Sequence, residues 1–121
     1  MTHDINIHHE DDHESASSYL VEEIRNLLVN SNRNFSIGLS GGNTPKLTYS
    51  MIAEKFDDLS KTFLWTIDDR WIEEDNDLSN QRMINEYFER TDANILKFEF
   101  TSSSPESDAK KYEDKLKSTI Q

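Results

Sequence analysis

The chain has 121 residues, of which 34% are hydrophobic, and its 24 acidic and 13 basic side chains give a formal net charge of −11. This length suits one domain or part of one, and the low apolar content predicts a small core. The negative charge disfavours nucleic acids and anionic membranes as partners, and the absence of cysteine excludes disulfides and thiol nucleophiles.

Hydrophobic patterning predicts strands that alternate with helices along the chain. In chain order we expect a strand at 5–7, a helix over 14–29, a strand at 35–39, a helix over 45–55, a strand at 63–68, a helix over 80–90 capped by Ser79, a strand at 95–100 and a helix from Ser104-Pro105 onward. The strand at 63–68 is apolar enough to be buried on both faces, as in a parallel sheet. This alternation predicts an α/β fold with a doubly wound, mostly parallel sheet and helices on both faces.

A glycine turn, Ser40-Gly41-Gly42-Asn43-Thr44, follows the strand at 35–39 and precedes a helix. Thr44 suits the N-cap and Pro45 the first helical position, while two glycines allow positive φ and close approach of a ligand. Unpaired amides and the positive end of a helix dipole then point to one place, which suits an anion such as phosphate. The alternative is an ordinary strand-to-helix turn whose glycines only reverse the chain.

A second polar segment, Asp68-Asp69-Arg70, ends the strand predicted at 63–68. Ligands of such sheets gather beyond the carboxyl ends of the strands, so this segment and the glycine turn are expected at one edge, with Lys46 and Arg70 as cations for an anionic ligand. One aspartate would hold the arginine and the other would accept from backbone amides. The alternative is a surface ion pair worth at most about 1 kcal/mol.

Other charged segments carry no clear chemistry. Four histidines near the N-terminus match no metal-ligand spacing, and the carboxylates at 73–77 lack the pattern of a calcium loop, so we expect a solvated tail, an exposed loop and no metal. No stretch approaches the ~20 apolar residues of a membrane span, and the polar N-terminus lacks a signal-peptide pattern. We therefore expect no membrane partner and a cytoplasmic location.

Three ordered motifs resemble 6-phosphogluconolactonases. They are Leu39-Ser40-Gly41-Gly42-Asn43-Thr44-Pro45-Lys46, Trp65-Thr66-Ile67-Asp68-Asp69-Arg70 and Asp77-Leu78-Ser79-Asn80-Gln81-Arg82-Met83. The family carries a Ser-Gly-Gly-Ser-Thr-Pro loop, an Asp-Glu-Arg strand end and a Ser-Asn helix start in this order. Asn43 and Asp69 depart mildly from that pattern, and the shorter Asp69 reaches one methylene less far than glutamate.

The resemblance implies a three-layer, Rossmann-like α/β fold of the glucosamine-6-phosphate isomerase and ribose-5-phosphate isomerase type. It implies hydrolysis of a phosphorylated sugar lactone, 6-phosphogluconolactone, to 6-phosphogluconate in the pentose phosphate pathway, without a cofactor. The implied substrate-binding residues are Ser40, Gly41, Gly42, Asn43 and Thr44 around the phosphate or ring oxygens, Arg70 on the same anion, and Asp68 and Asp69 to position the arginine.

The family's general base is a histidine in a Gly-x-Gly-x-Asp-Gly-His segment, which this sequence does not contain. Residues 1–121 are therefore expected to be a partial domain, the N-terminal half of a lactonase. Such a piece is expected to be inactive alone and to self-associate or require the missing C-terminal half. Two alternatives remain open: an aminosugar-phosphate deaminase or isomerase, against which Arg70 and the double glycine argue, and a sugar-phosphate-binding module without catalysis.

Overall fold

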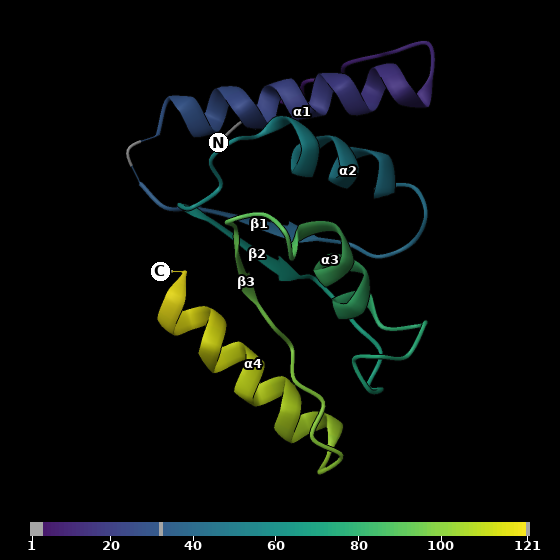
Figure 1. Ribbon diagram of the computed structural model, residues 1–121, viewed down its shortest axis with the longest axis vertical. Coiled ribbons are helices and arrows are strands. Elements are labelled where there is room, and N and C mark those ends of the chain that lie inside the picture. Colours follow the sequence, from purple (N-terminus) through teal and green to yellow (C-terminus); the bar gives the residue numbers. More distant parts are fainter. Residues whose placement is uncertain (1–3, 32, 121) are drawn as a thin grey trace.

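The computed structural model describes residues 4–31 and 33–120. Its elements in chain order are α1 (His13–Val29), β1 (Phe35–Leu39), α2 (Lys46–Lys55), β2 (Thr62–Thr66), α3 (Asn80–Phe88), β3 (Asn94–Leu96) and α4 (Pro105–Thr119) (Figure 1). The strand expected at 5–7 is wrong. Residues 4–10 have no regular secondary structure, and the side chains of Ile5 and Ile7 are exposed, because two apolar residues without a paired neighbour strand do not make a strand stable.

Three of the four helices begin at a side-chain cap. Oxygens of Asp12, Ser79 and Ser104 accept from backbone N–H groups three residues later at 2.7, 3.1 and 3.0 Å, which satisfies an amide that the helix leaves unpaired. The predicted starts of α3 and α4 are thereby confirmed. The expectation for Thr44 is wrong: α2 has Pro45 at its N-cap and no side-chain cap. Residues 43–45 form a turn in which the Lys46 N–H donates to the Asn43 carbonyl at 3.3 Å.

The strands form a parallel sheet, as predicted, and their order is β1-β2-β3. β2 ends at Thr66 rather than residue 68, because the Thr66 hydroxyl donates to the Asp68 carbonyl at 2.6 Å and turns the chain. β3 has three residues instead of the six expected over 95–100. It leaves the sheet early because the Phe98 N–H donates to Gln81 of α3 at 2.9 Å.

Helices flank the sheet on both sides, with α1 and α2 on one side and α4 on the other (Figure 1). The core lies between α1, α2, α3 and one sheet face, and Val21, Ile52, Leu64 and Phe88 are each at most 2% exposed there. On the other side, Tyr112 of α4 accepts from the Thr66 N–H at 2.9 Å and donates back to the Thr66 carbonyl at 3.2 Å. These bonds hold α4 at the end of β2.

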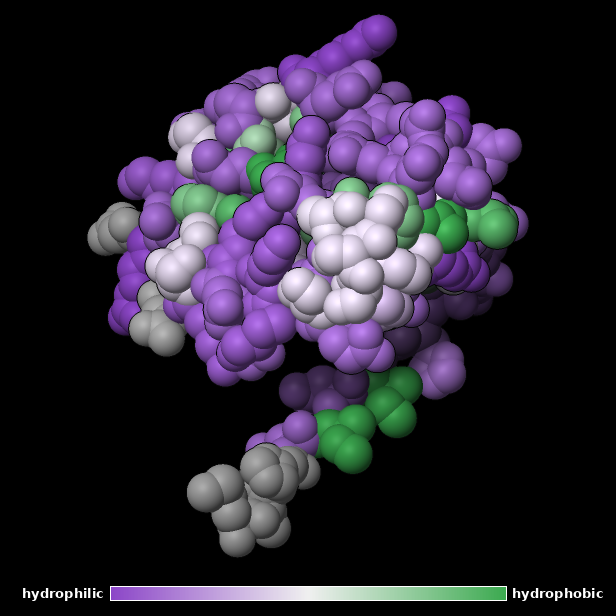
Figure 2. All heavy atoms as spheres, turned by 90° about the horizontal axis from the view of Figure 1, so that it is seen from below, coloured by the Kyte–Doolittle hydropathy of each residue, from purple (hydrophilic) through white to green (hydrophobic). Residues whose placement is uncertain are grey.

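The surface on the side of α4 is largely hydrophilic, with only scattered hydrophobic residues (Figure 2). This agrees with the strong negative charge and low apolar content of the sequence. None of the helices within 4–31 and 33–120 is both long enough and apolar enough to cross a bilayer.

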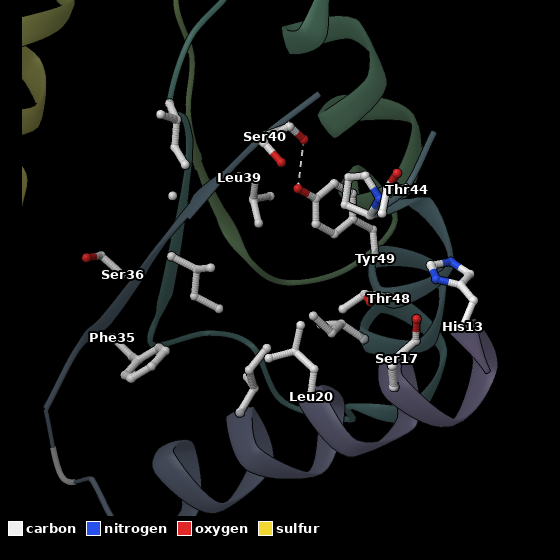
Figure 3. Close-up of a pocket in the computed structure, with 17 residues that line it drawn as sticks. His13, Ser17, Leu20, Phe35, Ser36, Leu39, Ser40, Thr44, Thr48 and Tyr49 are labelled. Atoms are coloured by element: carbon white, nitrogen blue, oxygen red, sulfur yellow. Dashed lines mark hydrogen bonds between the residues drawn. The ribbon is translucent and has the colours of Figure 1, made fainter. Parts of the chain in front are cut away.

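β1 is an edge strand whose outer side is open. The Phe35 N–H donates to Lys61 and the Leu39 carbonyl accepts from Ile67, at 2.8 and 3.0 Å. Because backbone groups alternate along a parallel strand, those of Ser36 and Gly38 point away from β2. An open apolar groove of about 640 Å³ runs beside this edge under α1 and α2, and side chains such as Leu20 of α1 surround it (Figure 3).

Candidate anion-binding site

The turn after β1, the loop after β2 and the start of α3 meet at one edge of the sheet. An open polar pocket of about 350 Å³ lies between them. Its lining residues are Gly42, Asn43, Lys46, Arg70, Asp77, Leu78, Ser79, Asn80, Arg82, Met83 and Glu86. Two segments that the sequence singled out separately, around Gly42 and Arg70, therefore share one cavity.

The two glycines of the turn meet different requirements. Gly42 has φ +87°, a backbone conformation that a side chain disfavours. Gly41 is required for space, since a Cβ atom there would lie 2.1 Å from the side-chain oxygen of Asn80. Helix α2 also contacts the turn, because the hydroxyl of its Tyr49 donates to the Ser40 carbonyl at 2.8 Å. Burial raises the pKa of Tyr49 above its ordinary value.

Asp69 ties the loop after β2 to the N-terminus of α3. Its carboxylate accepts from the backbone N–H groups of Arg70, Asn80 and Gln81 at 2.8, 2.7 and 3.0 Å. A carboxylate is favoured there by the unpaired amides and the helix dipole. The sequence assigned this amide-binding role to one of the two aspartates, and the structure gives it to Asp69.

Asp68 contributes its carbonyl to this arrangement. That carbonyl accepts from Nδ2 of Asn80 at 3.0 Å, whereas the exposed Asp68 carboxylate makes no hydrogen bond or ion pair within the described residues. Neither aspartate contacts the guanidinium of Arg70, contrary to expectation. Nη1 of Arg70 donates instead to the Leu78 carbonyl at 2.9 Å.

The cations that line the pocket differ in how their charge is balanced. Arg82 is paired with Asp77 at 2.7 Å and Glu86 at 2.9 Å, and the Glu86 hydrogen bond leads the contacts that raise its pKa. Lys46 and Arg70 form no ion pair within the described part of the chain. Two cations without a carboxylate partner, beside an amide-rich turn, favour binding of an anion.

The remaining predicted site residues lie at the margin of this pocket. Ser40 and Thr44 line the neighbouring apolar groove (Figure 3), and Gly41 lies against Asn80. The sequence analysis named Asn80 and Arg82 only as members of the third motif and gave them no site role. Both lie in the first turn of the helix that Ser79 caps, so the predicted helix start placed them next to the loops without showing that they face the pocket.

None of the described histidines, His8, His9 and His13, lines this pocket. The ring of His8 stacks on Tyr19 with centroids 3.4 Å apart, and His13 lies beside the apolar groove (Figure 3), while His3 is outside the described residues. Within residues 4–31 and 33–120, no group of three or more histidine, aspartate or glutamate side chains is arranged to hold a metal ion.

Comparisons with known proteins agree on one family. The family profile described as Glucosamine-6-phosphate isomerases/6-phosphogluconolactonase matches residues 9–121. A curated 6-phosphogluconolactonase from Synechocystis sp. is 34% identical over 90 residues, which cover 71% of this chain and 38% of that protein.

Solved structures give the same picture of the fold. A 6-phosphogluconolactonase from Shewanella baltica superposes with a TM-score of 0.82 at 24% identity, covering 93% of this chain and 50% of that one. One from Thermotoga maritima has a TM-score of 0.75 at 30% identity, covering 87% and 51%. The chain spans between 38% and 51% of the length of these relatives.

Proposed function

Because the chain belongs to the family of glucosamine-6-phosphate isomerases and 6-phosphogluconolactonases, we propose that its polar pocket binds the phosphate of a phosphorylated sugar lactone. In this proposal the protein binds substrate for the hydrolysis of 6-phosphogluconolactone to 6-phosphogluconate, a cytoplasmic step of the pentose phosphate pathway. The relatives from Synechocystis and Thermotoga are both 6-phosphogluconolactonases, which favours the lactonase over an aminosugar-phosphate deaminase.

One observation carries this proposal: Lys46 and Arg70 line the same pocket as Gly42 and have no ion pair within the described residues. The third cation of the pocket, Arg82, is already paired with Asp77 and Glu86, so Lys46 and Arg70 are the two that are left to stabilise a ligand's negative charge in this pocket. A guanidinium grips phosphate oxygens with two parallel hydrogen bonds. The ammonium of Lys46 adds a second point charge, and the Gly42 turn adds backbone amides.

These residues supply binding and orientation rather than the whole reaction. Lactone hydrolysis also needs a base to activate water and donors for the developing oxyanion. We assign no base to this chain, since none of its described histidines lies at the pocket. A phosphate held at one end of the substrate would orient the lactone carbonyl, which is the contribution of remote binding groups to catalysis.

The proposal is tested by calorimetric titration of the chain with 6-phosphogluconate and with gluconate. We expect binding of the phosphorylated compound alone, and loss of about 1.5–3 kcal/mol of binding free energy in Arg70→Ala, since hydrogen bonds between charged groups are removed. Arg90→Ala is the matched control, because it removes the same charge from an exposed position outside the pocket. Equal binding of gluconate, or equal losses in the two variants, would contradict the proposal.

A further inference from the structure

Asp108, in the first turns of α4, is a buried carboxylate that the proposed site does not use. Its side chain is 1% exposed. Oδ2 accepts from the Trp71 indole N–H at 3.0 Å and from the Thr101 N–H at 2.8 Å, and Oδ1 accepts from the Thr101 hydroxyl at 2.6 Å. A buried carboxylate is tolerated only when such donors replace water. Asp108 thus joins α4 to the residue that follows Arg70.

Trp71 depends on this contact for its position. Its side chain is 37% exposed, so burial in the core does not fix it. Apart from Asp108, its ring packs on Phe100, with centroids 5.1 Å apart at an angle of 64°. Of these two contacts, the hydrogen bond to the charged Asp108 carboxylate is the directional one.

Arg70 consequently lies between two anchors. On one side, the Asp69 carboxylate binds the amides at the start of α3. On the other side, the Trp71 indole binds Asp108 of α4. Both anchors restrict the backbone of Arg70, while its guanidinium donates to the Leu78 carbonyl and lines the pocket.

We propose that Asp108 is a positioning residue, which holds Arg70 at the anion pocket through the indole of Trp71. This rests on the proposed function, because the position of Arg70 matters only if it binds the ligand. A purely structural role would be different: Asp108 would then serve only to hold the connection at Thr101 against α4. The two roles use different hydrogen bonds of one carboxylate, so they can be separated by substitution.

Three variants separate the two roles. Trp71→Phe removes the indole donor and keeps a ring, Asp108→Asn removes the charge, and Thr101→Val removes only the hydroxyl that binds Oδ1. The affinity of each for 6-phosphogluconate is measured by calorimetry. We expect roughly fivefold weaker binding in Trp71→Phe and in Asp108→Asn. The double variant Trp71→Phe/Asp108→Asn should lose no further affinity, and Thr101→Val should stay within about twofold of wild type.

A second readout does not need a ligand. In ¹H–¹⁵N spectra, Trp71→Phe and Asp108→Asn should shift the backbone amide of Arg70 and speed its hydrogen exchange, whereas Thr101→Val should not. In Asp108→Asn the Trp71 indole resonance should move. The indole of Trp65 is the internal reference, because its buried Nε1 has no partner within the described residues.

The outcomes are distinct. The positioning role is overturned if Trp71→Phe leaves both the affinity and the Arg70 amide unchanged, or if Thr101→Val alters them equally. If wild type binds no 6-phosphogluconate, the proposed function fails. The chemical shift and hydrogen exchange of the Arg70 amide in the variants then decide the role of Asp108. If Asp108→Asn does not fold, the comparison of Trp71→Phe with Thr101→Val still decides it.

Discussion

Asn80 lies so close to Gly41 that a Cβ atom on the glycine would stand 2.1 Å from the asparagine side-chain oxygen. Asn80 is 8% exposed, and its Nδ2 donates to the Asp68 carbonyl at 3.0 Å, so it cannot move aside without losing that bond. The contact joins the turn after β1 to the loop after β2. These two segments form the proposed anion site together with the start of α3, to which Asn80 belongs.

Gly41→Ala should therefore destabilise the protein and disturb the pocket. We expect a loss of about 1–3 kcal/mol in the free energy of unfolding, the range for overpacking a close contact, measured by urea denaturation. Gly42→Ala is the comparison, because φ is +87° there but a Cβ would meet nothing within 4 Å. That strain alone costs about 1–2 kcal/mol. In a double variant Gly41→Ala/Asn80→Ala, the steric part should largely disappear; an undiminished loss would show that Asn80 is not the obstacle.

Asp69→Ala should also destabilise the protein, because it leaves the amides of Arg70, Asn80 and Gln81 without their acceptor. Thermal unfolding should report a loss of about 1–3 kcal/mol. Asp68→Ala is the matched control at the neighbouring position, where the carboxylate has no partner within the described residues and the change should stay within about 0.5 kcal/mol. Similar losses in both variants would contradict the geometry.

Asp108 should make stability depend on acid pH. Its hydrogen bonds with Thr101 and Trp71 lower its pKa from 3.8 to about 2. A lowered folded-state pKa gives stability that is present above the ordinary value and is lost as pH falls toward 2. Unfolding free energy should therefore drop between pH 4 and 2, and the drop should be smaller in Asp108→Asn.

Part of this acid dependence should persist in the variant. Contacts with nearby groups also lower the pKa values of Asp12, Asp58 and Glu113. An identical slope in wild type and Asp108→Asn would mean that folding does not lower the pKa of Asp108.

The open edge of β1 should cause association of the isolated chain, since unpaired backbone groups of an edge strand are a template for another strand. Sedimentation velocity should show species larger than the monomer that grow with concentration. Ser36→Pro should reduce them at little cost, because that N–H points away from β2. Ile37→Pro would instead remove an N–H that faces β2 and should destabilise the fold. Concentration-independent monomer in wild type would contradict this expectation.

Local signals predicted much of the fold correctly. Ser79 and Ser104-Pro105 gave the starts of α3 and α4, because capping depends on residues only three positions apart. Alternation of strands and helices gave the parallel sheet. Short strands were less predictable: β3 ends where Phe98 turns to a side chain of α3, a contact over 17 residues that local patterning does not contain.

The candidate site was predictable in its parts but not in its connections. Gly42 and Arg70 were named from sequence and share a pocket. Which of Asp68 and Asp69 accepts from the backbone amides of α3 was not predictable. Both carboxylates lie close to Arg70 in the sequence, and only the position of α3 distinguishes them. The link from Trp71 to Asp108, 37 residues away, likewise requires the packing of α4.

The most direct measurement of the central claim is a ¹H–¹⁵N titration of the chain with 6-phosphogluconate, followed at individual backbone amides. If the turn and the arginine grip the phosphate, saturable shifts will cluster at Gly42, Asn43 and Arg70, and gluconate will produce none. Shifts centred on the apolar groove under α1, or no saturable shift at the turn, would contradict the account.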